Sequence, residues 1–309
     1  MARYWTGYPT VKRFATTMLA GAALLVACDQ AAGPAPKGSP PHTISAVDVT
    51  SLDPPCATSF LVVGTTMTLL FNCTTDATIM IPQGFTLDGA SHTITAIDPV
   101  PTDPTPAPFL GAVVKAGGTA ANVLNVTING ALGTACQDGV NRLRGILFDG
   151  ASGSITGTTV VHIKRGANNG CQEGNAIEVR SCDETGTQTV VIDHNSVSDY
   201  QKTGILANCD VVATVTASTV QGVGPVSYIA QNGVQFGFGA AGEVSGNTIS
   251  DNFYTGCSHR DAAKTGCTPY VSAGLLLYDI DPSTVRRSNN MYRNNQFNVL
   301  LVTHQSLDS

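Results

Sequence analysis

The stretch "GNTISDN" at residues 246–252 is nearly repeated by "HNSVSDY" at residues 194–200. A looser third copy, "NNMYRNN", occupies residues 289–295. Asn tolerates the left-handed backbone region and hydrogen-bonds its neighbours, so the repeated Asn predicts a sharp bend between two short strands. If such units stack, equivalent Asn side chains can form a ladder. We therefore expect the repeat to be structural rather than catalytic.

Two motifs recur in step through the second half of the chain. Four segments share an apolar residue, a short polar residue three positions later and an apolar residue five positions later: Ile155/Thr158/Val160, Ile192/Asn195/Val197, Val215/Ser218/Val220 and Val244/Asn247/Ile249. A second motif reads "GILF" at Gly145, "AIEV" at Ala176, "GILA" at Gly204, "GVQF" at Gly233 and "GLLL" at Gly274. Strand alternation predicts that these bury Ile146/Phe148, Ile177/Val179, Ile205/Ala207, Val234/Phe236 and Leu275/Leu277. A unit this short cannot bury its apolar face alone, so neighbouring units must stack.

Composition agrees with an all-β protein. The 309 residues include 32 Gly, only 12% are charged and only 6% are aromatic. Such a chain is too apolar for disorder, and its Thr, Val, Ser and Asn favour strands and turns. The net charge of −6 and the lack of a basic stripe exclude a nucleic-acid partner from our expectations.

These repeats resemble the right-handed parallel β-helix of the pectate-lyase-like superfamily. The stretch "IMIPQGFTLDGASHTITA" at residues 79–96 is similar to the opening coil of that fold. The resemblance covers about residues 78–303 and implies an all-β, single-stranded right-handed parallel β-helix. It does not imply one activity, because lyases, hydrolases, epimerases, adhesins and inactive surface proteins share the fold. We expect a capping segment at residues 43–77 and the β-helix at residues 78–309.

The N-terminus predicts export and a lipid anchor. Basic residues precede the apolar run from Phe14 to Ala27, which is the length of a signal-peptide core. The run ends in "LLVAC", which resembles a bacterial lipobox and implies lipidation of Cys28 after cleavage of residues 1–27. Residues 28–42, rich in Pro, Gly and Ala, are predicted to be a tether. The expected location is the bacterial cell envelope, facing the periplasm or the exterior, with membrane contact through the lipid anchor only.

The cysteine count supports an oxidising compartment. Removing Cys28 from the nine Cys leaves eight, which can form four disulfides. Sequence does not fix the pairing, and we expect neighbours to pair: Cys56 with Cys73, Cys136 with Cys171, Cys182 with Cys209 and Cys257 with Cys267. Because no C-x-x-C pair occurs, we expect no metal and no other cofactor.

Candidate site residues come from outward positions of the "GILF"-type strands. Enzymes on such scaffolds work on an exposed strand face, where an extended polysaccharide lies across several coils. Asp149, Arg180 and Asn208 are predicted to form one outward column, with Glu178 and Lys202 beside it and Tyr278 further along. Stacked coils also form ordinary surface ion pairs that serve no catalytic purpose. A structural role for this column is therefore the alternative to a catalytic one.

An insertion at residues 253–270 is a second candidate. It contains Tyr254, His259, Arg260, Asp261 and Tyr270, and Cys257 and Cys267 are placed to close it. Aromatic rings beside charged donors suit sugar recognition, whereas the alternative is a solvated loop held by its disulfide.

Two classes of function stay open. The first is a lipid-anchored envelope protein that binds a glycan or an envelope component without catalysis. The second is a polysaccharide lyase or glycoside hydrolase that uses Glu178, Arg180, Lys202 or His259. The sequence lacks the dense Asp motifs that the resemblance would require of a calcium-dependent lyase or a hydrolase, and so favours the first class.

Overall fold

The computed structural model describes residues 56–100, 107–182, 186–256 and 271–302. These residues lie within one compact unit, Ser45–Ser309. They form β-strands joined by turns and three 3-10 helices, η2 (Ala57–Ser59), η3 (Gly139–Asn141) and η4 (Pro282–Thr284). Among the described residues, no helix has the length and apolar character needed to span a membrane.

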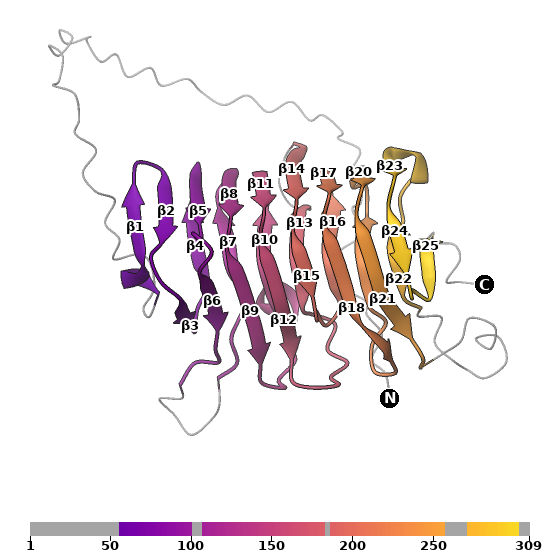
Figure 1. Ribbon diagram of the computed structural model, residues 1–309, viewed down its shortest axis with the longest axis horizontal. Coiled ribbons are helices and arrows are strands. Elements are labelled where there is room, and N and C mark those ends of the chain that lie inside the picture. Colours follow the sequence, from indigo (N-terminus) through magenta and orange to yellow (C-terminus); the bar gives the residue numbers. More distant parts are fainter. Residues whose placement is uncertain (1–55, 101–106, 183–185, 257–270, 303–309) are drawn as a thin grey trace, which may run out of the picture. The chain divides into compact units, whose positions relative to one another are not determined.

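The strands form three sheets that run side by side along one stack (Figure 1). Sheet A contains, in spatial order, β1 (Phe60–Val63), β2 (Thr66–Leu69), β5 (Phe85–Asp88), β8 (Ala120–Leu124), β11 (Ser152–Thr156), β14 (Gln188–Asp193), β17 (Val211–Thr216), β20 (Ala241–Ser245) and β23 (Val285–Ser288). Sheet B contains β3 (Cys73–Thr75), β6 (Thr93–Ala96), β9 (Thr127–Leu132), β12 (Thr159–Arg165), β15 (Ser196–Ser198), β18 (Thr219–Val226), β21 (Thr248–Tyr254) and β24 (Met291–Arg293). Sheet C contains β4 (Ile79–Pro82), β7 (Ala112–Gly117), β10 (Arg144–Asp149), β13 (Asn175–Ser181), β16 (Thr203–Cys209), β19 (Asn232–Gly237), β22 (Ala273–Tyr278) and β25 (Phe297–Val302).

The chain passes through the sheets in the order C, A, B and then enters the next coil. Among the described residues, the strands of successive coils pair in parallel, and the one antiparallel pairing joins β1 to β2 at the N-terminal end. The predicted parallel β-helix is therefore confirmed. β2 and β3 already pair with β5 and β6, so parallel stacking begins at Thr66.

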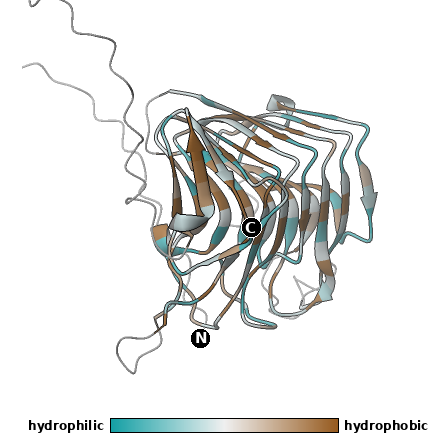
Figure 2. Cartoon of the chain, turned by 60° about the vertical axis from the view of Figure 1, so that its left-hand side comes forward, coloured by the Kyte–Doolittle hydropathy of each residue, from teal (hydrophilic) through white to brown (hydrophobic). Residues whose placement is uncertain are grey.

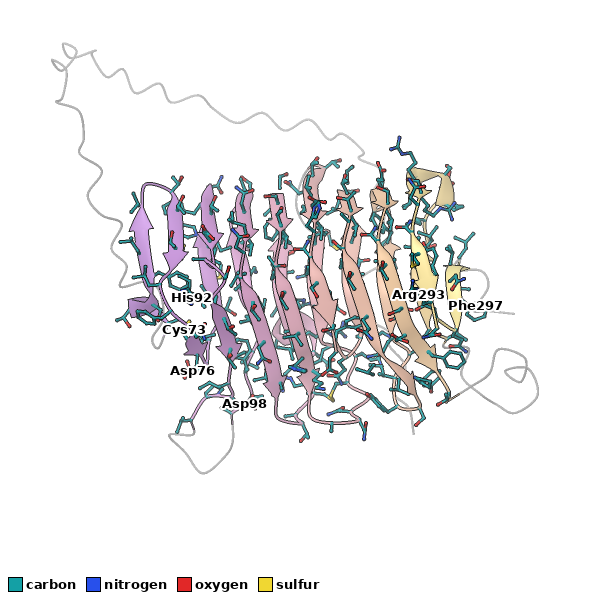
Figure 3. The ribbon with its side chains drawn as sticks, viewed as in Figure 1. Cys73, Asp76, His92, Asp98, Arg293 and Phe297 are labelled. Atoms are coloured by element: carbon teal, nitrogen blue, oxygen red, sulfur yellow. A yellow bond between two sulfur atoms is a disulfide. The ribbon has the colours of Figure 1, made fainter. Side chains whose placement is uncertain are left out.

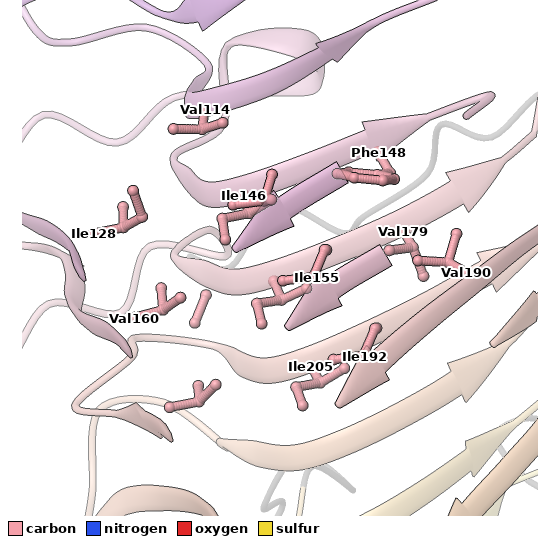
Figure 4. Close-up of a cluster of buried hydrophobic side chains, with 14 of the residues drawn as sticks. Val114, Ile128, Ile146, Phe148, Ile155, Val160, Val179, Val190, Ile192 and Ile205 are labelled. Carbon is pink, nitrogen blue, oxygen red and sulfur yellow. The ribbon is translucent and has the colours of Figure 1, made fainter. Parts of the chain in front are cut away.

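The predicted inward residues form columns in register. Ile146, Ile177, Ile205, Val234 and Leu275 are paired neighbours in sheet C, and none of them is exposed. Figure 4 shows part of this interior, where Ile146 and Phe148 from sheet C lie near Ile155 of sheet A and Val160 of sheet B. In Figure 2 the apolar colouring lies largely along the strands that enclose this interior. The faces assigned to the second motif are therefore correct.

The opening seven-residue motif makes two bends, one on each side of a sheet B strand. In "GNTISDN", Gly246 and Asp251 adopt positive φ, and the residues after them, Asn247 and Asn252, are buried. The other copies repeat this pattern, with positive φ at His194, Asp199, Asn289 and Asn294. Each copy therefore contains, at both bends, a residue with positive φ followed by Asn, except that Tyr200 takes the second Asn position in "HNSVSDY".

The first inward polar positions form the expected ladder. Asn195 Oδ1 accepts from the Thr158 amide at 2.9 Å, and its Nδ2 donates to Ile155 O at 2.9 Å. The backbone N–H of Asn195 donates to Ser218 Oγ at 3.0 Å, and the backbone N–H of Ser218 donates to Asn247 Oδ1 at 2.9 Å. The buried backbone amides of Thr158, Asn195 and Ser218 thus each find a side-chain acceptor in the next coil, which confirms the structural interpretation of the repeat.

The glycines of the second motif allow the coils to approach closely. A Cβ on Gly204 would lie 2.5 Å from Val220 Cγ1 and 2.6 Å from Gly233 O, and one on Gly233 would meet Gly274 O at 2.6 Å. Backbone oxygens cannot move aside, so a larger side chain would force neighbouring coils apart.

Three of the four expected disulfides are present, and the fourth, Cys257–Cys267, lies outside the described residues. The bonded pairs have Cα–Cα distances of 5.5, 5.3 and 5.0 Å: Cys56–Cys73, Cys136–Cys171 and Cys182–Cys209. The first lies at the N-terminal end of the stack, where Figure 3 labels Cys73 and Asp76; Arg293 and Phe297 mark the opposite end. Disulfides of this kind fit an exported protein.

Candidate functional site

The outer face of sheet C carries the predicted candidate column. Asp149, Arg180, Asn208, Gly237 and Tyr278 are successive neighbours in five parallel strands, β10 to β22. Parallel strands lie about 4.8 Å apart, so these side chains follow one another across the coils. The structure therefore brings together the three residues that the sequence placed in one column.

Arg180 joins two coils through a forked ion pair. Its Nε and Nη2 donate to the two carboxylate oxygens of Asp149 at 2.8 and 2.9 Å. Lys115 Nζ lies 3.6 Å from the same carboxylate. Burial disfavours the charge on Asp149, but the hydrogen bond and the charge of Arg180 outweigh this effect and hold the pKa of that carboxyl below its usual range. Asp149 is thus an ionised acceptor rather than a proton donor.

Glu178 is also fully engaged. Its Oε2 accepts from Arg144 Nε at 2.7 Å and from Asn175 Nδ2 at 2.8 Å, and its Oε1 lies 3.4 Å from Arg180 Nη1. Arg144 in turn donates to the backbone oxygens of Val140 and Arg142. Arg144 and Glu178 are each only 3% exposed. A carboxylate fixed by three donors in this way is poorly suited to proton transfer.

The middle row of this face is not an open surface. The expectation of an exposed strand face is wrong for Leu147, Glu178, Leu206 and Leu276, whose exposures are 3%, 3%, 7% and 8%. These residues do occupy the outward positions of the strand alternation, as predicted, but that alternation does not reveal what covers a sheet. Partial exposure is retained at Asp149, Arg180, Gln235 and Tyr278. Three of these four residues, Asp149, Arg180 and Tyr278, lie in the row toward the end of the sheet C strands, and we call this row the strip; Asn208 and Gly237 of the same row are buried.

The strip contains an unsatisfied acceptor beside an aromatic pair. Asn208 Oδ1 is buried and has no hydrogen-bond partner among the described residues. The neighbouring strand places Gly237 here, where a Cβ would lie 2.8 Å from that oxygen. In the next coil the rings of Tyr278 and Phe238 pack edge to face with centroids 5.2 Å apart. Leaving a buried acceptor unpaired costs about 1–3 kcal/mol, which a ligand hydroxyl would recover.

Lys202 stands apart from the ion pairs. Its Nζ donates to Ala230 O at 3.0 Å, and among the described residues it contacts neither Glu178 nor Arg180. Desolvation lowers the pKa of Lys202 to about 8, although part of the side chain still reaches solvent. The proposed catalytic residues are therefore not assembled into one cluster.

The predicted insertion lies mostly outside the described residues. His259, Arg260, Asp261, Tyr270, Cys257 and Cys267 all belong to that undescribed part. Phe253 and Tyr254 lie in β21, where they pair with Pro225 and Val226 of β18. Tyr254 is half-buried, and its amide donates to Gln296 Oε1 at 3.4 Å.

A second polar cluster was missed by sequence reasoning. His162 Nδ1 and Lys164 Nζ both contact Asp199 Oδ2, the latter at 2.6 Å. Lys164, Asp199 and Tyr228 line a shallow hollow at the second bend. Burial and the nearby charge of Asp199 raise the pKa of Tyr228. Asp199 belongs to the "HNSVSDY" repeat, but no sequence signal placed His162 and Lys164 beside it.

One group of potential metal ligands occurs in the described residues. It consists of Cys136, Cys171 and Glu173, but the two cysteines form a disulfide. Glu173 accepts from the Gln137 and Leu143 amides at 2.8 and 2.6 Å. Its carboxylate also lies 3.4 Å from the buried guanidinium of Arg165. This network holds loops together and leaves no free ligand set for a metal.

Comparison with known proteins assigns no family to this chain. No protein-family model matches the chain, and no curated protein matches it. A crystal structure of the Dettilon tailspike protein (gp208) is similar, at 14% identity and a TM-score of 0.29, over 77% of this chain and 61% of that chain. The chain thus spans less than two thirds of the tailspike chain. No functional statement about this chain follows from that likeness.

Proposed function

We propose that this chain is an exported β-helix protein that binds an extended glycan along the strip of sheet C, without catalysis. The supporting observation is the unpaired acceptor of Asn208, set between the Arg180–Asp149 ion pair and the Tyr278–Phe238 ring pair. Sugar sites combine hydroxyl-binding polar groups with aromatic rings. An extended polymer laid across the coils would meet one row position per strand.

The state of the carboxylates supports binding rather than catalysis. Asp149 and Glu178 are both neutralised by guanidinium groups at 2.7–2.9 Å. General acid catalysis needs a carboxyl that holds a proton near the working pH, whereas the contacts of Asp149 lower its pKa and keep it ionised. The same contacts fix the side chains in place, which reduces the ordering cost of binding.

Anchoring to the cell envelope is part of this proposal. The three disulfides are consistent with export, and the resemblance of the "LLVAC" stretch to a lipobox supports lipidation of Cys28. The tether at residues 28–42 would then hold the β-helix away from the membrane.

The test compares two asparagines on different sheets. Full-length wild-type protein is titrated with a panel of neutral and uronate-containing polysaccharides by calorimetry. Asn208→Ala should weaken binding by about threefold to tenfold, the value of one hydrogen bond, without lowering the melting temperature. Asn122→Ala, on the outer face of sheet A, is the matched control and should bind normally. Full affinity in Asn208→Ala would refute the site.

A lyase is the second candidate function, and Lys202 favours it. A lysine with a pKa of about 8 is partly neutral in mildly alkaline solution and can then accept a proton. The absorbance of unsaturated products should appear with a uronate polymer at pH 8–9 and disappear in Lys202→Met. If wild-type protein forms no product, the lyase function is rejected and only the binding function stands.

A further inference from the structure

The interior of sheet C is closed at the N-terminal end of the stack and open at the C-terminal end (Figure 1). The two inward residues of β4, the first strand of this sheet, are 5% and 0% exposed. In β25, the last strand, Val299 and Leu301 continue the inward columns of Leu275 and Leu277. They are nevertheless 39% and 46% exposed, whereas Leu275 and Leu277 are fully buried. The last strand of sheet C therefore presents interior side chains to the outside of the stack.

The last strands of the three sheets differ in charge. β23, which ends sheet A, reads "VRRS", and its exposed Arg287 takes the inward position next to buried Val244. β24, which ends sheet B, has only three residues and carries the exposed Arg293. β25 has six residues, "FNVLLV", without a charge and without Pro. Charged side chains and short length protect edge strands against pairing, so β23 and β24 have a protection that β25 lacks.

The outer edge of β25 has no strand beside it. On its other edge, β25 pairs in parallel with β22. Beyond residues 298–302, no strand in the described part of the chain continues sheet C. An uncharged segment of this length and β-propensity readily pairs with another strand when it lies on an open edge. Main-chain hydrogen bonds supply the affinity of such a pairing.

We infer that β25 pairs with the β25 of a second copy of this chain, across a two-fold axis. The partner must offer an open edge strand together with apolar side chains on its inward face, and the same end of another copy offers both. The opposite end of sheet C does not, because β4 ends in Pro82, which cannot donate to a ladder. An antiparallel ladder can pair a strand with itself, and two-fold dimers are the commonest homo-oligomers.

Strand alternation gives the register of this pairing. Directly opposite residues of an antiparallel ladder point to the same face. With Leu300 on the two-fold axis, Val299 lies opposite the partner's Leu301, so the exposed interior side chains of the two copies cover each other. Sheet C extends one strand beyond sheets A and B, so the arginines of β23 and β24 stay in water.

The same arrangement turns opposite charges toward each other. The C-terminal end of β25 lies beside the exposed Asp279, whose backbone N–H donates to Val302 O at 2.8 Å. Its N-terminal end follows the exposed Arg293. Neither Asp279 nor Arg293 forms an ion pair within the described residues. Antiparallel pairing directs the acidic corner of one copy toward the basic corner of the other, which favours this orientation.

The test is disulfide crosslinking across the two-fold axis. Full-length Leu300→Cys, treated with a mild oxidant, should run at twice the wild-type mass on a non-reducing gel and return to the monomer on reduction. Opposite Cα atoms in an antiparallel ladder are about 4.5–5.5 Å apart, within the reach of a disulfide. Met80→Cys is the matched control, because Met80 is exposed in the same outward row at the other end of sheet C. Both Met80→Cys and wild type should stay monomeric.

A charge on the strand supplies the second measurement. Val299→Lys, added to Leu300→Cys, should abolish the dimer band because the new charge would face the partner's Leu301. The fold should accept this lysine as it accepts Arg287 at the equivalent end position of sheet A. Val63→Lys, on the exposed face of the uncharged edge strand β1, should leave the band unchanged. Circular dichroism confirms that each variant is folded.

Three outcomes overturn the inference. A folded Leu300→Cys that gives no dimer band shows that β25 has another occupant or none. Equal crosslinking of Leu300→Cys and Met80→Cys shows random collision. Loss of the band with Val63→Lys and not with Val299→Lys assigns the association to β1. None of the substituted residues belongs to the strip on sheet C, so the result is independent of glycan binding.

Discussion

Replacing Asn195 with Ala probes the buried ladder that the repeat encodes. The side chain is 3% exposed and makes three hydrogen bonds, to the Thr158 amide at 2.9 Å, the Thr158 hydroxyl at 2.8 Å and Ile155 O at 2.9 Å. Alanine leaves all three partner groups buried and unpaired. At about 1 kcal/mol each, the free energy of unfolding should fall by about 3 kcal/mol.

The assay is thermal and urea unfolding followed by circular dichroism. For a domain of this size, about 3 kcal/mol corresponds to a melting temperature lower by about 6–12 °C. Asn122→Ala removes contacts at 2.8 and 3.4 Å on the partly exposed face of sheet A, where water can replace them. That control should lose less than about 1 kcal/mol. If both variants lose the same stability, the ladder does not stabilise the bends as we argue.

Three further predictions concern other parts of the chain. Metabolic labelling with a palmitate analogue should tag wild type and not Cys28→Ser, and equal labelling of both would disprove the lipid anchor. Lys202 has a folded pKa of about 8, below its ordinary 10.5, so the unfolded chain binds more protons between these values and stability should rise with pH across that window. Lys202→Met should flatten this rise in thermal melts at pH 7.5 to 10.5, and an unchanged slope would contradict the assignment. Gly204→Ala should cost about 1–3 kcal/mol because its Cβ would meet Gly233 O at 2.6 Å, whereas a neutral effect would mean that the coils can separate there.

The sequence by itself determined the repeating unit. Inward columns such as Ile146, Ile177 and Ile205 were readable because strand alternation has a period of two and does not depend on distant contacts. Three disulfides join the neighbouring cysteines that we expected to pair, although the sequence by itself left the pairing open. The repeated Asn was readable for the same reason: a left-handed bend restricts the choice of residue locally.

Only the tertiary structure decided which side chains are exposed on the sheet faces and which of them become neighbours. The sequence placed Leu206 outward, yet the residue is 7% exposed, because the alternation of side chains along a strand does not show how accessible a sheet face is. The register across coils decided that Arg180 forks onto Asp149 and that Lys202 stands apart from both. Coil lengths vary along this chain, so spacing alone could not show which outward residues become neighbours; the backbone hydrogen bonds between coils fix that choice.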